Sequence, residues 1–175
     1  MSRDPFQTAE VQIPGGTVTV VVDPDSGAVV ASGFGGFDLT WSFLDDAQRA
    51  RGHRSSPPDG AARVAVAVLR RYAAGDLDAL DEVPVEQHGG PFLMRAWHEL
   101  RGVPAGQTDS YAGLAARAGS PNAVRAAGQA CARNTVAPFV PCHRVLRSDG
   151  SLGGYAYGLP VKSALLEHEG ALLTS

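Results

Sequence analysis

The chain has 175 residues, of which 44% are hydrophobic and 19% charged, and its formal net charge is −3. This length allows one large or two small domains with a hydrophobic core, and no apolar run approaches the roughly 20 residues that cross a bilayer. The N-terminus lacks the apolar core of a signal peptide, so we expect a cytoplasmic protein without a membrane segment. Two cysteines, Cys131 and Cys142, are too few for a disulfide framework or a zinc site made of thiolates.

The first half of the chain predicts an α/β domain, a small antiparallel sheet with a helix, over residues 1–88. β-branched residues and turn signals indicate strands at 9–22, 28–31 and 38–43, followed by a polar connector at 51–60. Helical spacing of apolar residues predicts a helix at 61–74 that packs on the sheet through Val64, Val68, Leu69 and Tyr72. An acidic linker at 76–88 ends this domain.

The second half, residues 89–175, predicts a mostly α-helical domain with a winged helix-turn-helix-like motif. Helices are expected at 91–100, 111–118, 121–133 and 161–170, with Ser110 and Ser120 as N-caps. Residues 1–88 hold seven arginines against thirteen acidic residues, whereas 89–175 hold eight basic residues against five acidic ones. A phosphate-binding surface therefore fits only the second half.

The segment Pro141-Cys142-His143-Arg144-Val145 is the candidate reactive site. An imidazole beside a thiol is the commonest way to generate a thiolate near neutral pH. Pro138 and Pro141 fix φ and remove backbone donors, which indicates a rigid loop. From these residues alone, an inert, half-buried thiol remains the alternative.

The helix expected at 121–133 carries few large side chains, and its small residues are Ala123, Ala126, Ala127, Gly128 and Ala130. Small residues let a backbone approach another helix or a nucleic acid closely. Arg125 is the long cationic side chain in the middle of this helix, and on helix context alone it is a surface charge.

From Pro91 to Gly170 the sequence resembles the O6-alkylguanine-DNA alkyltransferases, also called methylated-DNA–protein-cysteine methyltransferases. The resemblance depends on the order and spacing of several motifs: Ser-Tyr at 110–111, Ala-Val-Arg-Ala-Ala-Gly at 123–128, Asn134, Pro-Cys-His-Arg-Val at 141–145 and Leu-Leu-Glu-His-Glu-Gly at 165–170. Each motif is weak alone, whereas their joint order is specific. The first half matches only loosely, as an α/β cap, and it lacks the zinc-binding cysteines of some relatives.

The resemblance implies direct-reversal DNA repair. A methyl or small alkyl group would pass irreversibly from O6 of guanine, or from O4 of thymine, to Cys142 after the nucleotide is flipped out of the duplex. His143 would act as a base through a water, Glu169 would orient its imidazole, and Tyr111 would donate a proton to the guanine. We expect a single turnover, no cofactor, no metal and a monomer whose partner is double-stranded DNA containing O6-alkylguanine. Cooperative binding to DNA is left open.

The resemblance also implies binding residues. Arg125 would fill the place of the flipped nucleotide, and the remaining DNA contacts would come from Ser110, Tyr111, Ala123 and Ala126. The substrate pocket would be formed by Asn134, Pro138, Val145, Tyr155, Ala156 and Tyr157. Ala156 stands where many relatives have serine, and Tyr157 where many have glycine. The bulky ring of Tyr157 predicts poorer acceptance of large O6 groups such as benzyl.

Three other functions fit parts of the sequence. A non-catalytic binder of alkylated DNA from the same superfamily would lack an acceptor cysteine. An unrelated cysteine hydrolase would need an oxyanion hole and no helix-turn-helix. A transcription factor would direct arginine, asparagine or glutamine toward base edges, whereas Asn122, Arg125 and Gln129 are sparse among alanines.

Overall fold

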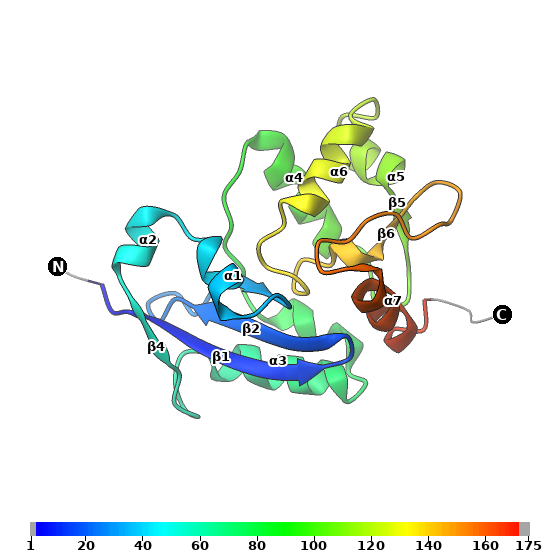
Figure 1. The fold of residues 1–175 in the computed structure, drawn as a ribbon. Coiled ribbons are helices and arrows are strands. Elements are labelled where there is room, and N and C mark those ends of the chain that lie inside the picture. Colours follow the sequence, from blue (N-terminus) through cyan, green and yellow to red (C-terminus); the bar gives the residue numbers. More distant parts are fainter. Residues whose placement is uncertain (1–2, 172–175) are drawn as a thin grey trace. The chain divides into compact units, whose positions relative to one another are not determined.

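The structure is a computed structural model that describes residues 3–171 (Figure 1). It divides into two compact units. The first holds the chain up to Gln87 together with Thr135–Phe139, and the second holds His88–Asn134 and the chain from Val140 onward. The predicted domains 1–88 and 89–175 place Thr135–Phe139 in the second domain, whereas the structure groups this segment with the first unit. Those domain limits stay a prediction.

The first unit is built on a four-stranded sheet in the order β3-β2-β1-β4. The strands are β1 Phe6–Ile13, β2 Gly16–Val22, β3 Val29–Gly33 and β4 His53–Ser55. Neighbours among the first three strands are antiparallel, but β4 runs parallel to β1. The predicted antiparallel sheet is confirmed for β1–β3, and β4, which was not predicted, makes the sheet mixed. The chain reaches β4 through two helices rather than a tight turn, and such a crossover allows parallel pairing.

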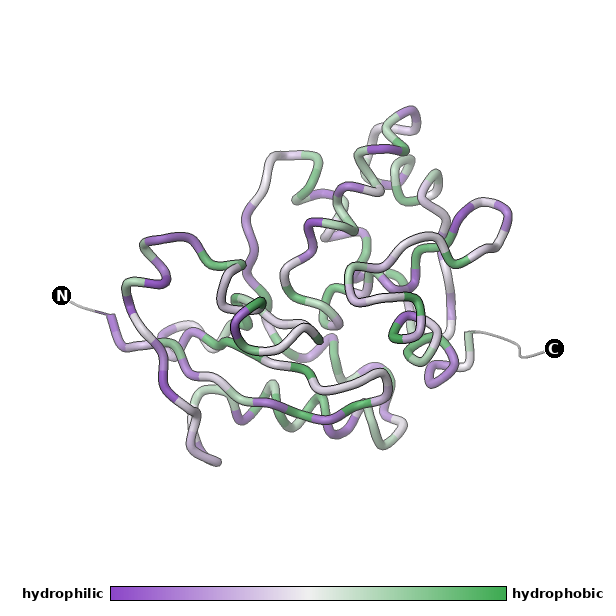
Figure 2. Tube along the Cα trace, in the orientation of Figure 1, coloured by the Kyte–Doolittle hydropathy of each residue, from purple (hydrophilic) through white to green (hydrophobic). Residues whose placement is uncertain are grey.

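Helices α1 Phe37–Ser42, α2 Asp46–Ala50 and α3 Arg63–Ala73, followed by the 3₁₀ helix η1 Leu77–Glu82, complete the first unit. Helix α3 buries Ala65, Val68, Leu69 and Tyr72. The predicted inward position of Val64 is wrong, because Val64 is 43% exposed and Ala65 takes its place in the helical repeat. The turn-by-turn alternation of hydropathy along α3 is visible in Figure 2.

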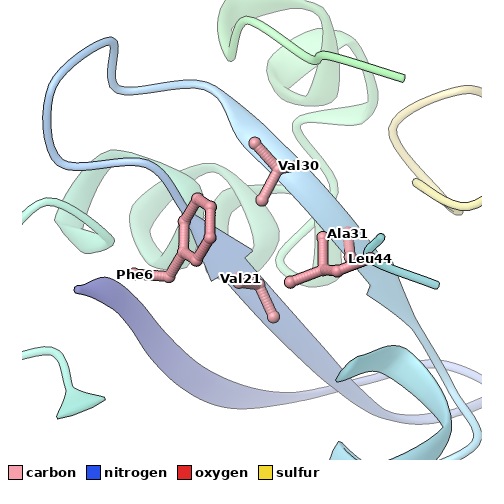
Figure 3. Close-up of a cluster of buried hydrophobic side chains, with 5 residues drawn as sticks. All are labelled: Phe6, Val21, Val30, Ala31 and Leu44. Carbon is pink, nitrogen blue, oxygen red and sulfur yellow. The ribbon is translucent and has the colours of Figure 1, made fainter. Parts of the chain in front are cut away.

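A buried cluster supports the sheet on the side of α1. Its members are Phe6, Val21, Val30, Ala31 and Leu44 (Figure 3), with Trp41 and Phe43 packed against them. The strand predicted at 38–43 is wrong, since this segment contains α1. Phe37 and Trp41 lie one helical turn apart and stack with ring centroids 5.8 Å apart, and Trp41 meets Phe6 edge-on. Packing against the sheet thus overrides the β propensity of these residues.

The returning segment Thr135–Phe139 pairs with β3. The backbone N–H of Ser32 donates to Thr135 O at 2.9 Å, and the Ser32 hydroxyl donates to Ala137 O at 2.8 Å. Ala137 and Phe139 are buried. This pairing anchors the chain immediately before it enters the second unit at Val140.

Up to residue 171, where the described part of the chain ends, the second unit contains four α-helices: α4 Pro91–Arg101, α5 Tyr111–Arg117, α6 Val124–Ala132 and α7 Leu159–His168. It also contains the 3₁₀ helix η2 Cys142–Arg144 and a short parallel ladder between β5 Asp109–Ser110 and β6 Val145–Leu146. Trp97 of α4 donates from its indole nitrogen to Ala130 O at 2.9 Å, and Arg95 donates to Ala118 O at 2.8 Å. These bonds fix α4 against α5 and α6.

The predicted start of α6 needs correction. Ser120 does not cap the helix, because the N–H of Ala123 donates to Ser120 O at 2.8 Å and closes a turn, so that α6 begins at Val124. Ser110 caps α5 as predicted, accepting from the N–H of Gly113 at 2.9 Å. Within residues 3–171, no helix combines the length and apolarity needed to cross a membrane.

Candidate active site

Cys142 begins η2, directly after Val140 and Pro141. The residue is 6% exposed and lines a cavity of about 390 Å³. The other lining residues are Tyr111, Gly128, Cys131, Ala132, Gly154, Tyr155 and Ala156. All of them belong to the second unit. The segment predicted to be reactive therefore presents its sulfur to a cavity formed by α5, α6 and the loop before α7.

Asn134 fixes the approach to Cys142. Its side-chain amide donates to Val140 O at 2.7 Å and lies 3.3 Å from the Cys142 sulfur. The first bond holds the backbone before the cysteine, and the second places a donor on the sulfur. A hydrogen bond to a thiol sulfur favours the thiolate.

His143, Arg144 and Glu169 form a buried ionic cluster, and the first two of these residues directly follow Cys142 in the chain. Nε2 of His143 lies 2.9 Å from Oε2 of Glu169. Arg144 donates to both carboxylate oxygens at 2.9 and 3.0 Å, and its third contact is Val103 O at 2.7 Å. All three residues are at most 4% exposed. The cluster ties η2 to the residue that ends α7.

The cluster sets the protonation states of its members. Burial raises the pKa of Glu169, but the hydrogen bonds and charges of His143 and Arg144 outweigh it and hold that pKa well below its usual range. Burial lowers the pKa of His143 more than Glu169 raises it, so the ring is neutral. An ionised Glu169 requires the proton on Nε2 of His143. Nδ1 of His143 is then an acceptor, and this buried atom has no hydrogen-bond partner among the described residues.

Tyr111, the first residue of α5, carries its hydroxyl to the cavity wall. Burial, followed by the charges of Cys131 and Cys142, raises the pKa of Tyr111, so its proton is retained. Gly153 has φ +71°, and a Cβ at this position would lie 3.0 Å from the Tyr111 hydroxyl. The chain therefore needs glycine at residue 153 to let the loop approach the tyrosine.

Lys162 is a functional candidate that the sequence reasoning missed. Its side chain is buried in α7, and its ammonium donates to the carbonyls of Val145, Leu152 and Gly154. Burial lowers the pKa of Lys162, while the neighbouring thiols raise it. The ammonium thus joins the segment after Cys142 to the loop that forms the far cavity wall. The sequence feature that could have identified Lys162 is its position one turn before the buried Leu165 and Leu166, on the same face of α7.

Arg125 and the small residues around it lie on a face of α6 that solvent can reach. Arg125 is exposed at the second position of α6, whereas Ala123 and Ala126 are only partly exposed. Ser110 is engaged as the cap of α5. The structure brings Ser110 and Tyr111 together at one helix start, and the roles of these residues toward DNA stay predictions.

The predicted pocket residues fall into two groups. Tyr155 and Ala156 line the cavity, while Asn134, Val145 and Tyr157 are not among its lining residues. Val145 is fully buried at the start of β6, and the ring of Tyr157 packs edge-on against Tyr155 at 5.6 Å. Pro138 belongs to the first unit, so its part in the pocket stays a prediction.

Within the part of the chain that the structure describes, no group of three or more histidine, cysteine or acidic side chains is arranged to hold a metal ion. Cys131 was not predicted as a site residue, yet it lines the same cavity as Cys142. Arg144 has no predicted role in the chemistry, and its contacts with Glu169 and Val103 O hold the loop in place.

Comparison with known proteins identifies the family. Residues 91–171 match the family model of the 6-O-methylguanine DNA methyltransferase DNA-binding domain. A methylated-DNA–protein-cysteine methyltransferase of Shigella flexneri is 45% identical over 60% of this chain and 61% of its own length. The corresponding protein of Mycobacterium tuberculosis is 36% identical over 85% of this chain and 89% of its own length.

Solved structures agree over nearly the whole chain. A variant of the M. tuberculosis O6-methylguanine methyltransferase has a TM-score of 0.77 at 30% identity, covering 97% of this chain and 96% of its own. The M. tuberculosis protein in complex with DNA has a TM-score of 0.76 at 32% identity, covering 95% and 92%. These proteins share the N-terminal sheet and the helical C-terminal part. The chain belongs to the methylated-DNA–protein-cysteine methyltransferase family.

Proposed function

We propose that this protein repairs alkylated guanine in duplex DNA by moving a methyl or small alkyl group from O6 to Cys142. The observation that carries the proposal is that Cys142 lines a cavity and is followed in the chain by a neutral imidazole whose Nε2 is held by Glu169 at 2.9 Å. A base with one nitrogen oriented and the other free is the arrangement that activates a thiol. The kinship with the M. tuberculosis enzyme supports the same activity.

The alkylated guanine would reach the cavity by base flipping. O6 lies within the base stack, where a thiolate cannot line up with the alkyl carbon, and unstacking costs a few kcal/mol, less for a poorly paired base. Arg125, exposed on a helix of small residues, would occupy the space left in the duplex. The relative solved in complex with DNA supports DNA as the partner.

The chemical step is one substitution. Nδ1 of His143 takes the thiol proton through a water, and Glu169 stabilises the imidazolium that forms. The Cys142 thiolate bonds to the alkyl carbon as the carbon–O6 bond breaks, and the leaving guanine takes a proton from Tyr111. Solvent then returns a proton to the phenolate. The thioether product is stable, so each molecule acts once.

The resting thiol suits this sequence of events. Burial raises the pKa of Cys142, whereas the Asn134 amide and the Lys162 charge lower it. Cys142 is thus a thiol until His143 removes its proton. Tyr111 also keeps its proton, because burial raises the pKa of its hydroxyl. A cytoplasmic location and a monomeric state stay predictions.

The direct test is stoichiometric labelling. Duplex DNA with radiolabelled methyl on guanine O6 is mixed with the protein, and the tryptic peptides are separated. We expect one label per molecule on the peptide 134–144, which contains Cys142, and none after Cys142→Ala. An unlabelled protein that still binds the alkylated duplex would instead indicate the non-catalytic binder.

A further inference from the structure

The cavity contains a second thiol. Gly128, Cys131 and Ala132 form the face of α6 that lines the cavity, with spacings of three and four residues. On this face Cys131 is the one side chain that extends beyond Cβ. Both cysteines are free, and they are the two cysteines of the whole chain.

Asn134 connects the two cysteines. Its backbone N–H donates to Cys131 O at 3.3 Å, and its side-chain amide lies 3.3 Å from the Cys142 sulfur. One residue therefore contacts both cysteines, and both cysteines line the same cavity. Reacting groups held in this way behave as if at very high concentration toward each other.

The two thiols are not equivalent. Burial, with the neighbouring Cys142 charge, raises the pKa of Cys131 strongly, whereas Cys142 has the Asn134 amide on its sulfur. His143 follows Cys142 in the chain, and Cys131 has no histidine beside it. Cys142 is consequently the first acceptor, and Cys131 can react only with an electrophile that is already placed next to it.

We propose that Cys131 is a second acceptor for two-carbon alkyl groups that carry a leaving group on their outer carbon, such as 2-chloroethyl. This inference rests on the proposed function of Cys142. In the first step the Cys142 sulfur bonds to the inner carbon and guanine leaves with the O6 electron pair. In the second step the Cys131 sulfur bonds to the outer carbon, chloride leaves with its electron pair, and the thiol proton passes to water.

The product is an ethylene bridge between the two sulfurs. A thioether with a halide on the second carbon activates itself, because its own sulfur can displace the halide and form a strained three-membered cation. Without a nearby thiol, this cation is captured by water or by a DNA base, which would attach the protein to DNA. Cys131 would remove the hazard within the cavity. A methyl group has no second electrophilic carbon, so Cys131 stays free after ordinary repair.

The experiment uses full-length protein and duplex DNA with O6-(2-chloroethyl)guanine, analysed by intact mass and tryptic mapping. Arg133 separates the two thiols, so peptides 126–133 and 134–144 form independently. We expect a mass gain of C2H2, loss of both thiols in denaturant, and these two peptides joined. Cys131→Ala should give a hydroxyethyl group on Cys142 or a protein–DNA adduct.

The control duplex carries O6-methylguanine. One outcome would overturn the second acceptor and leave the repair function intact. In it, the methyl duplex puts methyl on Cys142, while the chloroethyl duplex leaves Cys131 free and puts a hydroxyethyl group or DNA on Cys142. Absence of methyl on Cys142 would overturn the repair function itself. 1,2-Dibromoethane needs no guanine, so joined peptides from protein and this reagent alone would support the two-thiol step independently, and two singly alkylated cysteines would contradict it.

Discussion

Glu169→Gln tests the buried ionic cluster. The substitution keeps the size of the side chain and removes its charge, so Arg144, 3% exposed, loses the counter-ion that accepts from its Nε and Nη2. Removing one partner of a buried pair costs about 3–5 kcal/mol, because the other charge stays desolvated. Out of a typical total of about 5–15 kcal/mol, that is a large loss.

The assay is urea unfolding at pH 7, with Glu167→Gln as the matched control. Glu167 lies in the same helix, has the same charge and is exposed, so its loss should change the unfolding free energy by less than about 0.5 kcal/mol. An equal midpoint for both variants would refute the cluster as a source of stability. The m-value should stay constant, since the fold does not change.

The same variant predicts a pH dependence. The folded state lowers the pKa of Glu169, so its contribution is fully present above the unfolded pKa of about 4.3 and is lost as the pH falls below it. The stability difference between wild type and Glu169→Gln should therefore shrink in acid. A stability difference that stays constant from pH 7 to pH 3 would contradict the lowered pKa of Glu169.

The same variant should slow methyl transfer, measured on the folded fraction, by about 10²-fold because the imidazolium loses its stabilising charge.

Three further predictions concern substrate handling. Arg125→Ala should slow repair of duplex DNA by about tenfold or more, as filling a disrupted stack is worth about 1.4 kcal/mol or more, and should spare reaction with the free base. The matched control is exposed Arg133→Ala, and equal losses on both substrates would contradict the finger role. Tyr111→Phe should slow transfer by about 10²-fold through loss of the proton donor, and an unchanged rate would remove Tyr111 from the chemistry. Tyr157→Gly should raise the benzyl-to-methyl rate ratio by freeing the Tyr155 ring that Tyr157 packs against, whereas equal wild-type rates with both groups would contradict the size restriction.

The sequence predicted those elements whose pattern is local. Helices α3, α4 and α5 follow from apolar periodicity and capping residues, such as the Ser110 cap of α5. β4 could not be predicted, because its three residues are all exposed and show no apolar alternation. It pairs with β1 in parallel, with Thr8 Oγ1 also donating to Arg54 O at 3.4 Å, and the crossover that places it depends on the packing of α1 and α2.

The candidate site shows the same limit. Motif order singled out Cys142, His143 and Glu169, but nothing in the sequence shows that Arg144 and His143 share one carboxylate. Lys162, in contrast, could have been found from the sequence. Its helical phase matches that of Leu165 and Leu166, and a charge on a buried helix face requires partners. Cys131 could be recognised only from the cavity, since one thiol on an alanine-rich helix carries no signal.

The position of Glu169 explains why both Arg144 and His143 hold its carboxylate. Glu169 is the C-cap of α7, where the partial negative charge of the helix end opposes a carboxylate, and burial opposes it further. Arg144 and His143 together offset both effects, and in doing so they fasten η2, and hence Cys142, to the end of α7. The contacts that make His143 an oriented base are therefore the contacts that hold the acceptor loop in place. A variant that keeps Arg144 paired but removes the imidazole, such as His143→Gln, should separate the two roles: transfer should fall steeply, while the unfolding free energy should change by less than in Glu169→Gln.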